Sequence, residues 1–318
     1  MPEISQELLQ NVVKEEIHNV LEHYLKLECS LEELQVSIFS RRQEKQEFNK
    51  KRIVLIVSLT FLLTSIIYQL NIFSFIFGIR CVIPNNYFIW EATRPISDCN
   101  FCSNVTKPVI LHNVSKETFN PYAYSSQPIV ARGAFLYWPA KTKFSWHFFK
   151  ELYADIEDSY KSVEEECQFL HFKSDFISIK DVFSMSEARS NNKPGERSWY
   201  VGWGNCHPVI LQEMRKYYSK PNFLPADSEI PHKEYVFMGY DDGATMHLDF
   251  INRLMWQAQL KGEKLWNLLP PPECQAVCKP VEFKVYPGDG VLVDTRVWYH
   301  ATTIPNGQFS LSVQSEYG

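Results

Sequence analysis

Three residues in the last quarter of the chain are of types that together bind a metal ion. His247 and Asp249 are two residues apart, and residues two apart point to the same side of an extended strand. His300 follows a turn over residues 286–290 and an apolar stretch, and it supplies a third donor. Two imidazoles and one carboxylate that leave other positions open are typical of non-haem Fe(II) sites. The spacing therefore predicts His247, Asp249 and His300 as metal ligands and catalytic residues, although a His–Asp pair on a strand can also be a structural hydrogen bond.

Short strands are the elements expected to position these ligands. After Pro231 the pattern becomes β, and the last predicted strand alternates apolar and polar side chains as a half-buried strand does. Pro305-Asn306-Gly307 is a strong hairpin signal between the last two strands. Upstream, Ser145 is expected to cap one helix and Pro208 to begin another. Eight short antiparallel strands with flanking helices predict an α+β fold built on a jelly roll. The strands are predicted near residues 235–239, 245–250, 255–260, 264–268, 282–286, 291–294, 297–304 and 309–315.

Several segments resemble the JmjC/cupin-like oxygenases that depend on Fe(II) and 2-oxoglutarate. The resemblance covers about residues 120 to 315, and it implies a double-stranded β-helix over residues 126–318 with His247, Asp249 and His300 as the iron ligands. It also implies that Lys264 anchors the distal carboxylate of 2-oxoglutarate, with Lys261 as an alternative, and that the Thr245 hydroxyl donates to the same carboxylate. The segments that carry the resemblance are residues 127–134, 237–239, 243–249, 259–264, 270–272, 287–289 and 298–300.

The reaction that the resemblance implies is oxidative decarboxylation of 2-oxoglutarate coupled to hydroxylation of a substrate. A polypeptide substrate is favoured over a small molecule or a lipid, and hydroxylation over demethylation. Two other interpretations stay open. One is a catalytically silent, membrane-tethered cupin module that binds a partner, and the other is a metal-dependent cupin enzyme that uses no 2-oxoglutarate.

The first 50 residues are charged and nearly free of Gly and Pro. Their apolar residues are spaced alternately four and three apart, which is a heptad pattern and predicts a coiled coil that could join copies of the chain through residues 13–38. A single amphipathic helix lying on a membrane or on another protein is the alternative. The heptad positions are Val13, Ile17, Val20, Tyr24, Leu27, Leu31, Leu34 and Ile38.

A long apolar segment separates this region from the rest of the chain. Residues 53–79 carry no charge, and about 20 apolar residues suffice to cross a membrane. Six Lys and Arg residues within 41–52 precede the segment, so the positive-inside rule places the N-terminus in the cytosol. The segment is too long and too far from the N-terminus for a cleaved signal peptide. We therefore expect a transmembrane helix over residues 53–78 that acts as a signal anchor.

The resulting topology is that of a single-pass type II membrane protein. A stalk over residues 80–125 would precede a catalytic domain in the endoplasmic reticulum, the Golgi or outside the cell. Asn104-Val105-Thr106 and Asn113-Val114-Ser115 are glycosylation acceptor sequences just beyond the membrane. Both agree with a lumenal, glycosylated domain.

Cysteine usage and net charge indicate the redox compartment of the chain and the kind of partner it binds. Of eight cysteines, six lie beyond the membrane edge, and an even number in an oxidising compartment predicts disulfides whose pairing cannot be deduced. A zinc site made by Cys99, Cys102, Cys274 and Cys278 is the weaker alternative. A net charge of −5 argues against nucleic acid as a partner, because phosphate binding needs clustered Lys and Arg.

Overall fold

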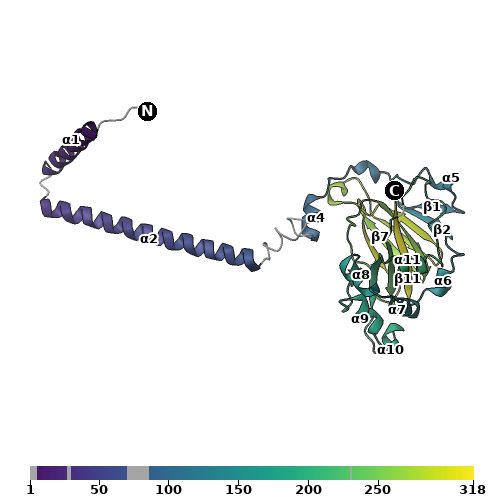
Figure 1. Ribbon diagram of the computed structural model, residues 1–318. Coiled ribbons are helices and arrows are strands. Elements are labelled where there is room, and N and C mark those ends of the chain that lie inside the picture. Colours follow the sequence, from purple (N-terminus) through teal and green to yellow (C-terminus); the bar gives the residue numbers. More distant parts are fainter. Residues whose placement is uncertain (1–5, 27–29, 70–85, 230) are drawn as a thin grey trace. The chain divides into compact units, whose positions relative to one another are not determined.

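The computed structural model describes residues 6–26, 30–69, 86–229 and 231–318 (Figure 1). The chain divides into two compact units, Met1–Ala92 and Thr93–Gly318, which are described separately. Helix α4 (Tyr87–Thr93) crosses the boundary between them.

Within residues 6–26 and 30–69 of the N-terminal unit, two helices cover the region that was predicted as a coiled coil. Helix α1 (Gln6–Leu25) ends before residue 27, and α2 (Leu31–Gln69) begins a new helix. The start of α2 has a reciprocal cap, because the Ser30 hydroxyl accepts from the Glu33 N–H at 3.2 Å and the Glu33 carboxylate accepts from the Ser30 N–H at 3.0 Å. The helix is therefore interrupted within the predicted coiled-coil region, residues 13–38, and heptad position Leu27 lies outside the described residues.

The second half of α2 is apolar. Its stretch Glu47–Tyr68 is 22 residues long with a mean hydropathy of 1.8, enough to cross a membrane. The hydroxyls of Thr60 and Thr64 donate to backbone carbonyls of the preceding turn, at 2.8 to 2.9 Å, so neither needs a water partner. Residues 70–78 of the predicted span lie outside the described part of the chain.

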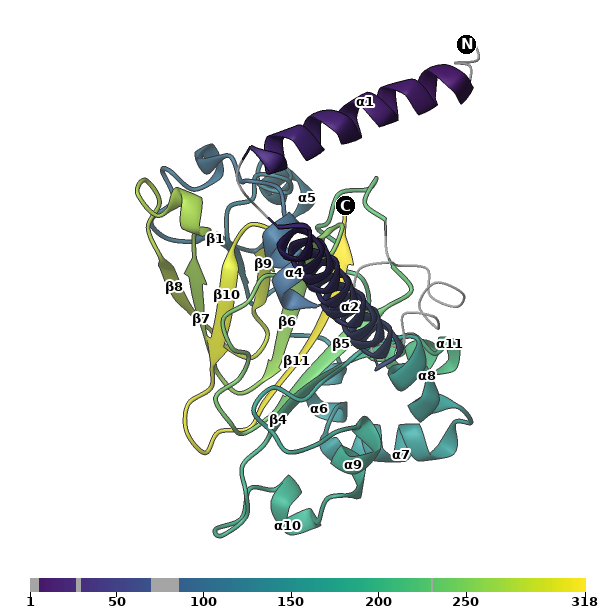
Figure 2. The ribbon, with the colours of Figure 1, turned by 90° about the vertical axis from the view of Figure 1, so that its left-hand side faces the viewer.

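The C-terminal unit is a mixed α+β structure built on an eight-stranded sheet (Figure 2). The strand order is β1-β2-β9-β6-β11-β5-β4-β3, and every neighbouring pair is antiparallel except β1 with β2. In chain order the strands are β1 (Val109–His112), β2 (Ile129–Arg132), β3 (Phe169–Leu170), β4 (Tyr200–Asn205), β5 (Glu234–Gly239), β6 (Leu254–Lys261), β9 (Gly290–Val293) and β11 (Ser310–Tyr317).

Helices pack against one face of this sheet. Alternate residues of its central strands, such as Trp203, Trp256 and Val313, form the main apolar core together with helix residues such as Phe149 and Ile210. Ser145 caps α7 as predicted, accepting from the Phe148 N–H at 3.1 Å, and Pro208 begins α11. The helices after β2 are α6 (Ala140–Lys143), α7 (Trp146–Asp155), α8 (Ser159–Glu165), α9 (Ile179–Ser184), α10 (Glu187–Ser190) and α11 (Pro208–Met214).

A three-stranded sheet, in the order β10-β7-β8, lies over the other face. Its strands are β7 (Lys264–Leu269), β8 (Val281–Val285) and β10 (Tyr299–Thr303). The Lys264 ammonium reaches from β7 to side chains on β4, β6 and β11 of the large sheet, so the two sheets face each other.

Seven of the eight predicted strands are present, and the hairpin is wrong. Strands β10 and β11 flank Pro305-Asn306-Gly307 but do not pair, because β10 pairs with β7 while β11 pairs with β5 and β6. The turn, with Gly307 at φ +74°, carries the chain from one sheet to the other.

The predicted strand 245–250 is also wrong. The segment lies alongside β10. The Thr302 N–H donates to the Ala244 carbonyl, and the His300 N–H donates to the His247 carbonyl. The acceptors Ala244 and His247 are three positions apart in the chain, whereas the donors Thr302 and His300 are only two positions apart. One extra residue therefore interrupts the ladder, as in a β-bulge. His247 forms an isolated bridge with His300 instead of belonging to a strand.

The predicted stalk is part of the folded unit from residue 93 onward. Strand β1 pairs with β2, and helix α5 (Lys116–Phe119) buries Phe119 in the main core. The 3-10 helix η1 (Cys99–Phe101) is joined to the loop after β7, which contains η2 (Pro272–Cys274). The compact unit therefore includes residues 93–125, which were predicted as a stalk, and residues 80–85 lie outside the described part of the chain.

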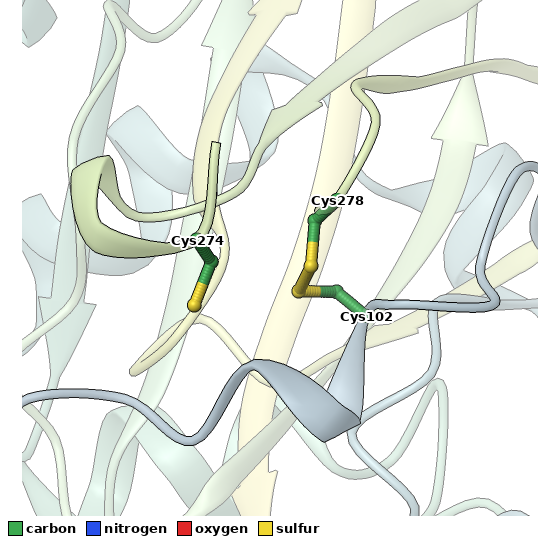
Figure 3. A group of neighbouring side chains, drawn as sticks. All are labelled: Cys102, Cys274 and Cys278. Atoms are coloured by element: carbon green, nitrogen blue, oxygen red, sulfur yellow. A yellow bond between two sulfur atoms is a disulfide. The ribbon is translucent and has the colours of Figure 1, made fainter. Parts of the chain in front are cut away.

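Two disulfides, Cys99–Cys274 and Cys102–Cys278, make this junction, here called the cysteine clasp. Figure 3 shows Cys102 and Cys278 joined through their sulfur atoms with Cys274 beside them. The Cα–Cα distances of 5.3 and 5.4 Å suit disulfides. A third disulfide joins Cys167 and Cys206. Because all four clasp sulfurs are bonded in pairs, the zinc site is not formed.

Candidate metal centre

The structure brings His247, Asp249 and His300 together. His247 and His300 exchange two backbone hydrogen bonds, at 3.1 and 2.9 Å, and their rings lie 4.2 Å apart between centroids. The Asp249 N–H donates to the Thr295 carbonyl at 3.0 Å, which holds its side chain beside the two rings. The potential ligand atoms of the three residues all lie within 4.8 Å of one another.

Backbone carbonyls set the orientation of both imidazoles. His247 Nδ1 lies 2.6 Å from the Thr245 carbonyl, and His300 Nδ1 lies 3.3 Å from the Trp298 carbonyl. A carbonyl only accepts, so Nδ1 is the protonated nitrogen in each neutral ring. The Nε2 lone pairs are then available to a metal, as when an outer partner fixes the tautomer of a metal ligand.

Distances from Asp249 fit ligands in adjacent positions around one ion. Asp249 Oδ1 lies 3.4 Å from His247 Nε2, and Oδ2 lies 3.8 Å from His300 Nε2. Metal bonds of about 2.1 Å in adjacent octahedral positions separate ligand atoms by about 3 Å. Two nitrogens and one carboxylate on one face of an ion are the ligand set of Fe(II) sites with open positions, so these residues fit Fe(II).

The protonation states of Asp249 and His300 also suit a cation. Burial alone would raise the pKa of Asp249, but the neighbouring His300 and His247 hold it at about 2. Burial lowers the pKa of His300 to about 4. Burial acts in the same direction on His247, but its hydrogen bond to Asp249 and the charge of that carboxylate outweigh burial and raise its pKa. At neutral pH the site therefore offers an ionised carboxylate and a neutral His300.

Lys264 lies in the same interior, and its side chain is buried. Its Nζ donates to the Tyr200 hydroxyl at 3.2 Å, to Gln257 Oε1 at 3.1 Å and to the Ser312 hydroxyl at 2.9 Å. Burial lowers the pKa of Lys264 to about 7. In the described part of the chain no carboxylate is within salt-bridge distance of this ammonium, so an anionic ligand would relieve its desolvation.

Thr245 does not approach Lys264. Its side chain is exposed, and its carbonyl rather than its hydroxyl contacts the site, through His247. One of the two hydroxyls beside Lys264 belongs to Tyr200 on β4. Burial raises the pKa of Tyr200, so this hydroxyl is neutral and can donate a hydrogen bond. Sequence reasoning missed Tyr200 because 64 residues separate it from Lys264. The available signal was a tyrosine at the start of the short segment 200–205, which forms the fully buried strand β4.

Lys261, the alternative anchor, is the last residue of β6 and is half-buried. Burial lowers the pKa of Lys261, as it does that of Lys264. No hydrogen bond from its ammonium to the polar residues around Lys264 is present among the described residues. The geometry favours Lys264 over Lys261.

No protein-family model matches the chain, and no curated protein is similar enough to count as a relative. The interpretation of the site therefore depends on its geometry and on the motifs themselves.

Proposed function

We propose that this chain is a membrane-anchored oxygenase that depends on Fe(II) and 2-oxoglutarate and hydroxylates a polypeptide. The observation that carries the proposal is the convergence of His247, Asp249 and His300 in one interior with a buried lysine that has only neutral partners. The two facing sheets support the further proposal of a double-stranded β-helix of the JmjC/cupin type.

His247, Asp249 and His300 would hold Fe(II) through two Nε2 atoms and a carboxylate oxygen. When bound, Fe(II) and 2-oxoglutarate supply oxidation by O2, with release of succinate and CO2. The protein holds both histidines in the required tautomer through the Thr245 and Trp298 carbonyls. It also keeps Asp249 ionised at neutral pH.

Lys264 and Tyr200 would bind the distal carboxylate of 2-oxoglutarate. A carboxylate oxygen would replace one of the neutral acceptors of the Lys264 ammonium, and the Tyr200 hydroxyl would donate to the same group. Charge-assisted hydrogen bonds are stronger than neutral ones, so the exchange favours the bound anion.

Partial exposure of the metal ligands supports a polypeptide substrate. The side chains of His247 and Asp249 are 30% and 22% exposed, while that of His300 is 7% exposed. Met246 and Phe250, on the same segment, present apolar surface beside them, at 38% and 37% exposure. A site that opens at the surface, next to apolar side chains, admits a segment of another chain.

The disulfides support a lumenal or extracellular position for this unit. Disulfides persist in oxidising compartments and are rare in the cytosol, and the unit contains three. With α2 crossing the membrane, the basic residues before its apolar half would face the cytosol.

The test is Fe(II)-dependent turnover of 2-oxoglutarate by the full chain in detergent micelles. We expect succinate from the parent and from Asp241→Ala, a control on the same segment outside the ligand set. Asp249→Ala should form none and should lose metal-linked binding of 2-oxoglutarate. A well-folded parent that binds no 2-oxoglutarate and forms no succinate would refute the proposal and favour a catalytically silent, partner-binding module.

A further inference from the structure

Trp266 is a buried tryptophan on the inner face of β7. Burial alternates along this strand, so that Lys264, Trp266 and Leu268 point inward toward the large sheet while Leu265 and Asn267 are half-buried. The Trp266 side chain is 1% exposed. It therefore shares one face of one strand with the proposed carboxylate anchor.

The indole ring lies beside a metal ligand. Its centroid is 5.9 Å from that of the His300 ring, and the two planes differ by 22°. Phe283, on the neighbouring strand β8, stacks on the indole ring, with a distance of 6.3 Å between ring centroids and an angle of 4° between the planes. In register, Trp266 is opposite Thr302, two residues from His300 along β10. Trp266 thus lies between Lys264 and the metal ligands along the three-stranded sheet.

Its indole N–H is buried and has no hydrogen-bond partner among the described residues. Four other buried tryptophans do have partners. Trp146 donates to the Val182 carbonyl at 3.0 Å, Trp199 to that of Arg189 at 3.0 Å and Trp298 to that of Ser126 at 2.8 Å, while Trp203 donates at 3.0 Å to Tyr153 and Asn205. Buried donors are paired in the great majority of cases, and leaving one unpaired is destabilising. An acceptor from a bound molecule would remove this cost.

We propose that the Trp266 indole N–H donates a hydrogen bond to an oxygen of the 2-oxo dicarboxylate, which makes Trp266 a further binding residue. The inference deepens the proposed function and rests on it. A co-substrate that extends from Lys264 to the metal passes the face of β7 on which Trp266 lies, and all its oxygens are acceptors. The stacked His300 and Phe283 rings restrict rotation of the indole, so the donor is held in place before the ligand binds.

Trp203 provides a matched control, because it is equally buried and its N–H already has protein acceptors. The experiment measures 2-oxoglutarate binding by calorimetry to the Mn(II)-loaded full chain in detergent micelles, together with thermal unfolding. Trp266→Phe should weaken 2-oxoglutarate binding about tenfold with a thermal midpoint near that of the parent. Trp203→Phe should lower the thermal midpoint and leave the affinity within about twofold.

A spectroscopic measurement gives an independent readout. In the Zn(II)-loaded chain with ¹⁵N-labelled tryptophan, the indole resonance that Trp266→Phe removes should shift downfield when 2-oxoglutarate is added. If Trp266→Phe does not fold, 3-benzothienylalanine at position 266 keeps the ring system, replaces N–H by sulfur and should show the same loss of affinity.

The two proposals fail in different ways. A parent that binds 2-oxoglutarate together with a Trp266→Phe variant of equal affinity would overturn the role of Trp266 alone, as would an indole resonance that does not move. A parent that binds no 2-oxoglutarate would overturn both.

Discussion

Lys264 carries its charge in a place where its hydrogen-bond partners, Tyr200, Gln257 and Ser312, are all neutral. Replacing it by Met keeps a similar volume and removes the ammonium. We expect Lys264→Met to fold and to bind 2-oxoglutarate roughly 100-fold more weakly, because a charge-assisted hydrogen bond is lost. Calorimetric titration of the metal-loaded chain measures the change.

Lys261→Met is the matched control, since it removes a lysine from the end of the neighbouring strand β6. Its affinity for 2-oxoglutarate should stay close to that of the parent. The reverse result, with Lys261→Met impaired and Lys264→Met unaffected, would transfer the anchor to Lys261.

Binding of 2-oxoglutarate should take up a proton above neutral pH. Burial lowers the pKa of Lys264 to about 7 in the free protein, and a bound carboxylate stabilises the ammonium and raises that pKa. Between the two values the complex carries one proton more than the free protein, so affinity falls as pH rises, by up to about tenfold per unit. Calorimetry at pH 8 in two buffers of different ionisation enthalpy should report uptake of up to one proton, and Lys264→Met should abolish it.

The cysteine clasp is the feature that acts on whole elements. It ties η1 to the loop between β7 and β8, and Arg94 adds a salt bridge to Glu273 in that loop at 2.6 Å. Each disulfide closes a loop of about the same length, with sequence separations of 175 and 176 residues. In the chain-entropy model, a disulfide that closes such a loop stabilises the fold by about 5 kcal/mol. Once one of the two disulfides is formed, the second closes only a small ring and adds much less.

The two disulfides of the clasp should therefore be strongly non-additive. Removing either alone, as Cys99→Ser/Cys274→Ser or as Cys102→Ser/Cys278→Ser, should lower the free energy of unfolding much less than removing both. Denaturant unfolding of the four proteins gives the coupling between the pairs. Equal and additive losses would show that each bond stabilises the fold through its own local contacts instead.

At the scale of the whole molecule, topology is the property to test. Asn104 and Asn113 are exposed, so both acceptor sites are accessible on the folded unit. If this unit is lumenal, both should carry oligosaccharide in cells, and Asn104→Gln and Asn113→Gln should each abolish one glycosidase-sensitive mobility shift. Unmodified sites together with digestion of this unit by protease added to the cytosolic side would contradict the lumenal orientation.

Association through the N-terminal unit also stays a prediction. Val13, Ile17 and Val20 are exposed on α1, each by half or more. A second copy of the chain would cover this apolar row. Ile17→Lys should then convert a dimer in detergent to a monomer, as measured by light scattering, whereas a parent that is already monomeric would exclude association by this route.

The sequence by itself determined what depends on neighbours along the chain. A long uncharged run is sufficient to identify the apolar half of α2, and short segments of strand-like pattern after Pro231 are sufficient to locate seven strands. The Ser145 cap and the Pro208 helix start are local hydrogen-bond and dihedral effects. The types of His247, Asp249 and His300 indicated a metal site because coordination chemistry depends on the donor atoms. The cap formed by Ser30 and Glu33 is also local, since the two residues are three positions apart in the chain.

Only the tertiary structure decided what depends on residues far apart in the chain. Six cysteines allow 15 pairings, and the choice of three followed from which loops lie side by side. Tyr200 became the neighbour of Lys264 because two sheets face each other. The turn at Asn306-Gly307 joins those sheets, because β10 pairs with β7 while β11 pairs with β5 and β6. Local patterns specify elements and donor types, while packing decides which of them meet.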